Sequence, residues 1–279
     1  MRCRKDGALG KGTGFLIPIA TAKGQQARVT QTFPTFPAAA ALRAVIERGL
    51  REEPLRIRPL TGPDGERLWL KRAETLSLRL RLQKGDSAKG FEKDRQGLHL
   101  LGAAGLPVAP ILAEGADFFV TPDLGVTLQT LLRDSDMPQE AKLAPFAAAG
   151  AALAQLHSAR YCHGRPSIRD ICWDGVQARF IDLERFSAER RDPASFSMDV
   201  LIFVHSVFAV DRRAQPVLDC AIRAYRAGVP DAVWAAVRRK GARFGWVGPV
   251  TAPLRWLRPQ SRDLNALPLT LAYIADQAA

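Results

Sequence analysis

The most constraining feature of this sequence is the stretch 153–186, whose pattern predicts a loop followed by a β-hairpin. An apolar helix over 147–156 leads into a loop that begins at Cys162-His163-Gly164. Two short hydrophobic strands follow, at 171–173 and 178–183, with turn residues between them. The stretch therefore predicts a hairpin that directly follows a buried helix and a glycine-containing loop.

Polar side chains lie where these strands begin and end: His163, Arg165, Asp170, Asp182 and Glu184. Several carboxylates beside a His-Gly loop are costly to bury for packing alone. Ionisable groups gathered in this way are typical of functional sites. The hairpin is therefore the candidate site of the chain.

The residues of this stretch resemble the catalytic and metal-binding loops of kinase-like phosphotransferases. Those enzymes typically read His-Gly-Asp-Leu, then Asn-Ile-Leu and, after a turn, Ile-Asp-Phe. Here His163-Gly164, Asp170-Ile171-Cys172 and Ile181-Asp182-Leu183 fall at the corresponding places. Over residues 55–210 or so, the chain resembles the lipopolysaccharide-core sugar kinases, the Kdo and heptose kinase group. Two positions depart from the pattern: Arg165 stands at the usual catalytic aspartate, and Asp170 replaces the metal-binding asparagine.

The resemblance implies an α+β, bilobal protein-kinase-like fold with a small antiparallel β N-lobe and a mainly helical C-lobe. We expect residues 1–38, which are basic and rich in Gly and Pro, to form a flexible arm. The N-lobe, a β-sheet plus one helix, is expected over 39–122. The C-lobe is expected over 123–279, with the catalytic and metal-loop hairpin at 163–184.

Three residues of the predicted N-lobe and hinge would bind the nucleotide by resemblance. Lys71 ends a strand at 67–71, at the place of the lysine that grips the phosphates. Glu92, near the start of a helix over 87–103, corresponds to the glutamate that holds this lysine, with Asp94 as the alternative. Either carboxylate could instead be a surface residue near a helix N-terminus. Asp123 lies within the segment 118–125, which resembles the hinge between kinase lobes.

The predicted chemistry is phosphoryl transfer from ATP with Mg²⁺. Asp170 and Asp182 offer the hard oxygen ligands that Mg²⁺ prefers, and Glu184 either adds a third ligand or orders the loop. The catalytic candidates are Asp170, Arg165 and His163. Arginine cannot accept a proton, so three interpretations stay open. Asp170 orients the acceptor from a shifted position, Arg165 stabilises the transferring phosphate, or the chain is a pseudokinase that binds nucleotide and acts through conformation or a partner.

Composition bounds the partners and the location. The net charge of +12 favours anionic partners such as a nucleotide, a phosphorylated sugar or an anionic lipid surface, although arginines spread over exposed faces would give the same excess. Nucleic acid is unlikely as a partner, since the sequence has no aromatic RNA motif or helix-turn-helix signature. The four cysteines form no CxxC pair and indicate a reduced, cytoplasmic protein. By resemblance, the acceptor is a sugar hydroxyl of a glycolipid at the inner membrane, with peripheral membrane contact.

The C-terminal part is predicted to be helical and to carry two further features. Asp199 begins a very hydrophobic helix, where it either anchors the catalytic loop through backbone N–H groups or caps the helix. A basic, aromatic stretch follows at 238–256, with Phe244, Trp246 and Trp256 among arginines. Core packing with a solvated basic rim is the favoured interpretation of this stretch, and contact with a membrane interface or an anionic ligand is the alternative. A strand is also predicted at 76–82 from alternating leucines, and no membrane-spanning helix is expected.

Overall fold

The computed structural model describes residues 37–73 and 87–277, so almost all of the predicted arm and the whole strand predicted at 76–82 lie outside the described residues. The chain divides into two compact units. We call them the sheet unit, with described residues 37–73 and 111–123, and the helical unit, with described residues 87–110 and 124–277.

The sheet unit consists of one helix and a four-stranded antiparallel sheet. The helix is α1 (Pro37–Arg51), and the strand order is β1 (Ile57–Thr61), β2 (Arg67–Arg72), β4 (Phe118–Pro122) and β3 (Ala113–Glu114). The turn between β1 and β2 contains Gly65, whose positive φ of 82° suits a glycine. The apolar face of α1 packs on the sheet through Ile46, which joins a buried cluster with Leu68, Leu70 and Val120.

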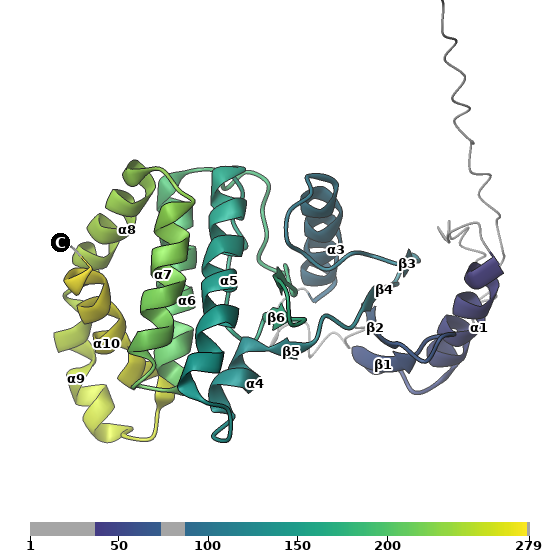
Figure 1. Cartoon of the computed structure of the whole chain (residues 1–279), viewed down its shortest axis with the longest axis horizontal. Helices are drawn as coiled ribbons and strands as arrows, with labels where there is room; N and C mark the ends of the chain where they lie inside the picture. Colours follow the sequence, from purple (N-terminus) through teal and green to yellow (C-terminus); the bar gives the residue numbers. More distant parts are fainter. Residues whose placement is uncertain (1–36, 74–86, 278–279) are drawn as a thin grey trace, which may run out of the picture. The chain divides into compact units, whose positions relative to one another are not determined.

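The helical unit contains a second, three-stranded antiparallel sheet and most of the helices. The sheet order is β5 (Val126–Thr127), β6 (Ile171–Trp173) and β7 (Ala178–Phe180). The described helices are α3 (Ser87–Ala103), α4 (Leu128–Arg133), α5 (Gln139–Ser158), α6 (Pro193–Val210), α7 (Gln215–Ala227), α8 (Asp231–Arg243), α9 (Val247–Leu257) and α10 (Arg262–Asp276). Helix α5 packs against α7, and α6 packs against α8 and α10 (Figure 1).

These elements confirm the predicted α+β class, with a small antiparallel sheet near the N-terminus and a mainly helical C-terminal part. One grouping differs from the sequence-based lobes, because α3 belongs by its contacts to the helical unit and not to the sheet unit. The predicted β6–β7 hairpin is present, but its second strand ends at Phe180 and not at 183. The cause is Asp182, whose φ of 61° is left-handed and ends the extended backbone.

Helix α6 is the most apolar helix among the described residues. It begins six residues earlier than the sequence indicated, at Pro193, because Asp192 caps it by accepting the backbone N–H groups of Ala194 and Ser195. Its 18 residues are long and apolar enough to cross a membrane, with a mean hydropathy of 1.6, but half of that length is buried inside the protein. Since α6 also contains a buried aspartate, Asp199, we interpret it as the central core helix of the helical unit.

Candidate functional site

The His163-Gly164 loop is held in place by a carboxylate from the core. The side chain of Asp199 accepts the backbone N–H of His163 at 2.7 Å and that of Gly164 at 3.0 Å. Its Oδ2 also lies 3.4 Å from Nε2 of the buried His157. The predicted anchoring role of Asp199 is therefore confirmed, while its alternative role as a helix cap is wrong, because the cap is Asp192.

His163 joins the loop to the end of the hairpin. The side chain is fully buried, its Nε2 lies 3.0 Å from the carbonyl oxygen of Ile181, and its Nδ1 lies 3.3 Å from the backbone N of Arg165. Nε2 therefore donates to the carbonyl, and Nδ1 accepts from the amide. Burial lowers the pKa of His163, so the ring is neutral. With both nitrogens engaged, this imidazole positions Arg165 and Ile181.

Gly164 is required by its backbone conformation and by the space around it. Its φ is +94°, which L-residues rarely adopt. A Cβ atom at this position would lie 2.3 Å from the carbonyl oxygen of Arg185. The loop and the segment after the hairpin thus approach each other more closely than any side chain would allow.

The loop brings two carboxylates together around one guanidinium group. Nη2 of Arg165 lies 3.3 Å from Oδ2 of Asp182 and 4.0 Å from Oδ2 of Asp170. The backbone N–H of Ile181 donates to the carbonyl of Asp170 at 2.9 Å, which joins the two strand ends that carry these carboxylates. The arrangement places a positive charge between two negative ones, as a bound cation would.

Asp170 is a buried carboxyl group whose charged form is destabilised by its surroundings. Its residue is 5% exposed, and its Oδ2 is buried without a hydrogen-bond partner among the described residues. Burial, and then the nearby charge of Asp182, raises the pKa of Asp170 to about 7, against the opposing effects of Arg169 and Arg165. A buried carboxylate oxygen without a partner fits a hard cation such as Mg²⁺.

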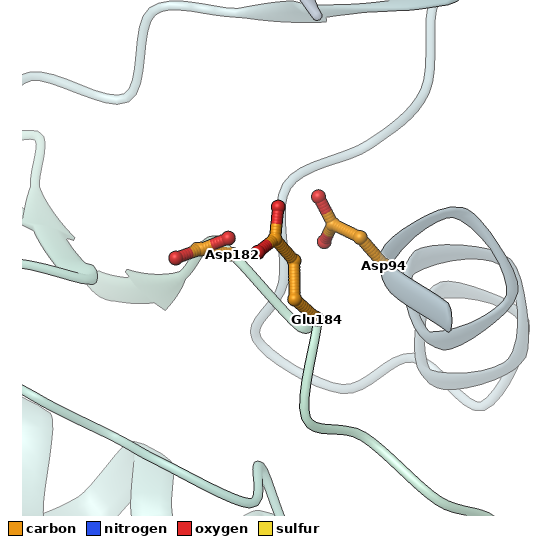
Figure 2. Close-up of side chains that lie close together, drawn as sticks. All are labelled: Asp94, Asp182 and Glu184. Atoms are coloured by element: carbon orange, nitrogen blue, oxygen red, sulfur yellow. The ribbon is translucent and has the colours of Figure 1, made fainter. Parts of the chain in front are cut away.

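A third and a fourth carboxylate lie close to Asp182. One ligand oxygen from each of Asp94, Asp182 and Glu184 can be chosen so that all three lie within 4.8 Å of one another. Asp94 comes from helix α3, whereas the other two come from the segment after β7, and Figure 2 shows that the carboxylate of Glu184 lies between those of Asp94 and Asp182. Asp94 also accepts the backbone N–H of Leu183 at 2.7 Å.

Helix α3 approaches this segment along a stripe of small residues. Gly90, Asp94 and Gly97 are spaced by four and three residues, so they share one helix face. A Cβ atom at Gly97 would lie 3.0 Å from the side chain of Leu183, and one at Gly90 would lie 3.6 Å from Glu184. This Gly-Asp-Gly spacing is the sequence signal that could have favoured Asp94 over Glu92.

The structure describes the predicted nucleotide-binding residues each within its own unit. Glu92 is 41% exposed and pairs with Arg95 at 2.6 Å, a neighbour on its own helix. Lys71 is buried on β2 of the sheet unit. Asp123, also in the sheet unit, lies 3.5 Å from Arg67. Because Lys71 and the carboxylates belong to different units, their pairing stays a prediction.

The comparisons with known proteins add no function. No family model matches the chain. An uncharacterized protein of Haemophilus influenzae is 27% identical over 192 residues, which cover 69% of this chain and 79% of that protein. A solved co-crystal structure of WbdD and the kinase inhibitor LY294002 is similar with a TM-score of 0.40 and 14% identity; the match covers 64% of this chain and 45% of that one.

Proposed function

We propose that this chain is an ATP-dependent phosphotransferase of kinase-like fold that uses Mg²⁺. The observation that carries the proposal is the convergence of Asp170 and Asp182 on Arg165, with one buried oxygen of Asp170 left without a hydrogen bond. Phosphoryl transfer needs little covalent work from a protein, and depends on metal-held phosphates, a positioned acceptor and fixed charges. Asp170 and Asp182 supply carboxylate oxygens for the metal, and Arg165 supplies a fixed positive charge.

Each side chain has a role in the proposal. Asp170 and Asp182 would hold Mg²⁺, which supplies neutralisation of the phosphate charge when it is bound. By resemblance, Lys71 would bind the phosphates. Asp94 takes the place proposed from sequence for Glu92, because it faces the segment that carries Asp182 while Glu92 pairs with Arg95.

The proposal assigns the orientation of the acceptor hydroxyl to Asp170 and not to Arg165, because a protonated guanidinium group cannot accept a hydrogen bond from a hydroxyl. Arg165 then stabilises negative charge on the transferring phosphate, while His163 holds the loop. A general base typically contributes about 10²–10⁴-fold to a rate, so an enzyme with Arg165 at the place of the usual catalytic aspartate would be slow.

The acceptor and the location are proposed from the resemblance alone. A sugar hydroxyl of a lipopolysaccharide-type glycolipid would be phosphorylated at the inner membrane surface by a cytoplasmic protein. The charge of +12 supports an anionic acceptor of this kind.

A second candidate is a pseudokinase, a nucleotide-binding regulatory or scaffold protein without turnover. The observation in its favour is that Arg165 already forms an ion pair with Asp182. A protein-borne cation between the carboxylates would weaken Mg²⁺ binding without abolishing it and would displace the metal from the position that turnover needs. The two candidates therefore differ in turnover and not in nucleotide binding.

The test is a titration of Mg-ATP followed by thermal stability and by ATP turnover. Compared proteins are the wild type, Asp182→Asn, Asp170→Asn and the control Glu189→Gln, an exposed carboxylate in the loop after the hairpin. Stabilisation by Mg-ATP that is lost in Asp182→Asn and kept in Glu189→Gln supports both candidates. Turnover that falls at least about 100-fold in Asp170→Asn supports the enzyme.

Two outcomes decide against one or both candidates. Stabilisation by Mg-ATP without turnover on any acceptor, water included, supports the regulator. Absence of stabilisation by Mg-ATP in the wild type at saturating concentrations would remove both.

A further inference from the structure

Helix α9 turns its apolar side chains outward. Trp246, Val250, Leu254 and Leu257 follow one another at spacings of four, four and three residues, so they form one stripe along the helix. These side chains are 61%, 61%, 47% and 65% exposed, and the adjacent Trp256 is 82% exposed. None of the residues of α9 is buried. The core packing favoured from the sequence is therefore wrong for Trp246 and Trp256.

The opposite face of α9 is the more polar one and is turned toward the protein. Thr251 and Arg255 are partly buried there. The Thr251 hydroxyl donates to the carbonyl of Val247 at 2.7 Å, and the Arg255 guanidinium donates to the carbonyl of Gly248 at 3.2 Å. A surface helix normally packs its apolar stripe inward. The reverse arrangement in α9, which packs against α10, indicates that the stripe is covered by a partner.

The charge around the stripe selects the kind of partner. Between Asp231 and Asp263 the chain carries seven Arg and Lys residues and no Asp or Glu. Arg243 precedes the stripe by three residues, Arg258 directly follows it, and both are exposed. A partner that covers the stripe must therefore tolerate or prefer many positive charges nearby.

We propose that α9 is an in-plane membrane anchor that docks on an anionic lipid bilayer. A helix with an apolar face of Trp and Leu, flanked by arginines, has the chemistry of an interfacial helix. Trp246, which begins the stripe, and Trp256, which is adjacent to its end, fit the headgroup level of a bilayer, where a tryptophan ring is partly in apolar and partly in wet surroundings. The arginines would bind anionic headgroups.

A second copy of this chain fits the stripe less well. Two copies that met through α9 would bring two such basic segments together, in a protein whose net charge is already +12. Like charges at an interface are unfavourable. The bilayer proposal concerns a surface that includes none of the phosphotransferase residues, so it stands independently of the proposed function.

The experiment measures binding of the full chain to vesicles. Vesicles of phosphatidylcholine with 30 mol% phosphatidylglycerol are compared with vesicles of phosphatidylcholine alone, by sedimentation and by tryptophan fluorescence. We expect binding to the anionic vesicles that weakens as salt is raised, with a blue shift of the emission as Trp246 and Trp256 enter the interface.

Two variants test the two components of the surface, each with a matched control. The apolar variant is Leu254→Ser, Trp256→Ser and Leu257→Ser; its control changes three exposed apolar residues elsewhere, Leu55→Ser, Leu100→Ser and Val176→Ser. The basic variant is Arg243→Gln, Arg258→Gln and Arg262→Gln; its control removes three exposed arginines elsewhere, Arg48→Gln, Arg51→Gln and Arg133→Gln.

We expect each test variant to bind anionic vesicles at least about tenfold more weakly than its control, since both apolar burial and headgroup contacts contribute to such binding. Equal loss in variant and control would overturn the proposal, because binding would then follow bulk charge or exposed apolar area and not α9. Absence of binding by the wild type would also overturn it. So would a dimer, seen by analytical ultracentrifugation, that the apolar variant abolishes.

Discussion

Replacing Asp170 by asparagine tests whether the ionised form of this buried carboxyl lowers the free energy of unfolding. The carboxyl is 5% exposed, and burial with the nearby Asp182 raises its pKa from 3.8 to about 7. A pKa that is higher in the folded than in the unfolded state means that the folded protein binds this proton more tightly. The resulting stabilisation is fully present below about pH 4 and is lost as the pH rises through about 7.

The magnitude follows from the pKa. One pKa unit corresponds to about 1.4 kcal/mol, so a rise from 3.8 to about 7 amounts to about 4 kcal/mol of folding free energy. Asparagine keeps the shape of the side chain and carries no charge. We therefore expect the free energy of unfolding of Asp170→Asn to be nearly that of the wild type near pH 4. At pH 8 we expect the variant to be about 2–4 kcal/mol more stable than the wild type.

Urea unfolding followed by tryptophan fluorescence measures this difference. Four of the five tryptophans, all except Trp69, lie in the helical unit, so the signal reports mainly the unit that contains Asp170. Free energies from the midpoint and slope are compared at several pH values from 4 to 8. The exposed control Glu189→Gln is expected to stay within about 0.5 kcal/mol of the wild type throughout. A difference between Asp170→Asn and the wild type that is constant with pH would refute the reasoning, and so would a variant that is less stable at pH 8.

Two further predictions concern the loop. Asp199→Asn removes the charge that accepts the backbone N–H groups of His163 and Gly164, and an amide can offer only one acceptor oxygen; we expect a loss of about 2 kcal/mol in urea unfolding and weaker Mg-ATP binding. Gly164→Ala is expected to cost more than 2 kcal/mol, because its Cβ would meet the Arg185 carbonyl at 2.3 Å in addition to the strain of a positive φ. Gly175→Ala is the matched control: φ is +100° but no atom lies within 4 Å, so only about 1 kcal/mol should be lost. Equal losses at the two glycines would contradict the close approach at Gly164.

The hairpin could be predicted because its signals are local. Alternating or continuous apolar residues with a turn between them specify β6 and β7, and a polar residue at a strand end is visible in the sequence. The pairing of Arg165 with Asp182 was not visible, although both residues were candidates. It depends on the left-handed φ of Asp182 and on the contact between His163 and Ile181, and both are set by the packed loop.

For the helices too, the sequence predicts where an apolar segment lies but not its exact start or the face that it buries. The sequence shows the apolar run of α6 but predicts its start at Asp199, since a buried aspartate in a helix interior and a capping aspartate look alike in a sequence. The sequence does not decide between Glu92 and Asp94, because the choice depends on which face of α3 packs on Leu183. The sequence favours core packing for the aromatic residues at 238–256, because composition indicates amphipathicity but not the direction in which a helix is turned.

The sequence by itself determined the class of the fold, the hairpin with its carboxylates, and the excess of positive charge. These follow from short-range periodicity, turn chemistry and composition, which each segment carries regardless of its neighbours. The tertiary structure alone decided that Asp94 rather than Glu92 faces Asp182, that a guanidinium group stands between Asp170 and Asp182, and that the apolar face of α9 is exposed. Each of these depends on which distant segment fills the space beside a residue, and that is set by packing of the whole unit and not by any one stretch of chain.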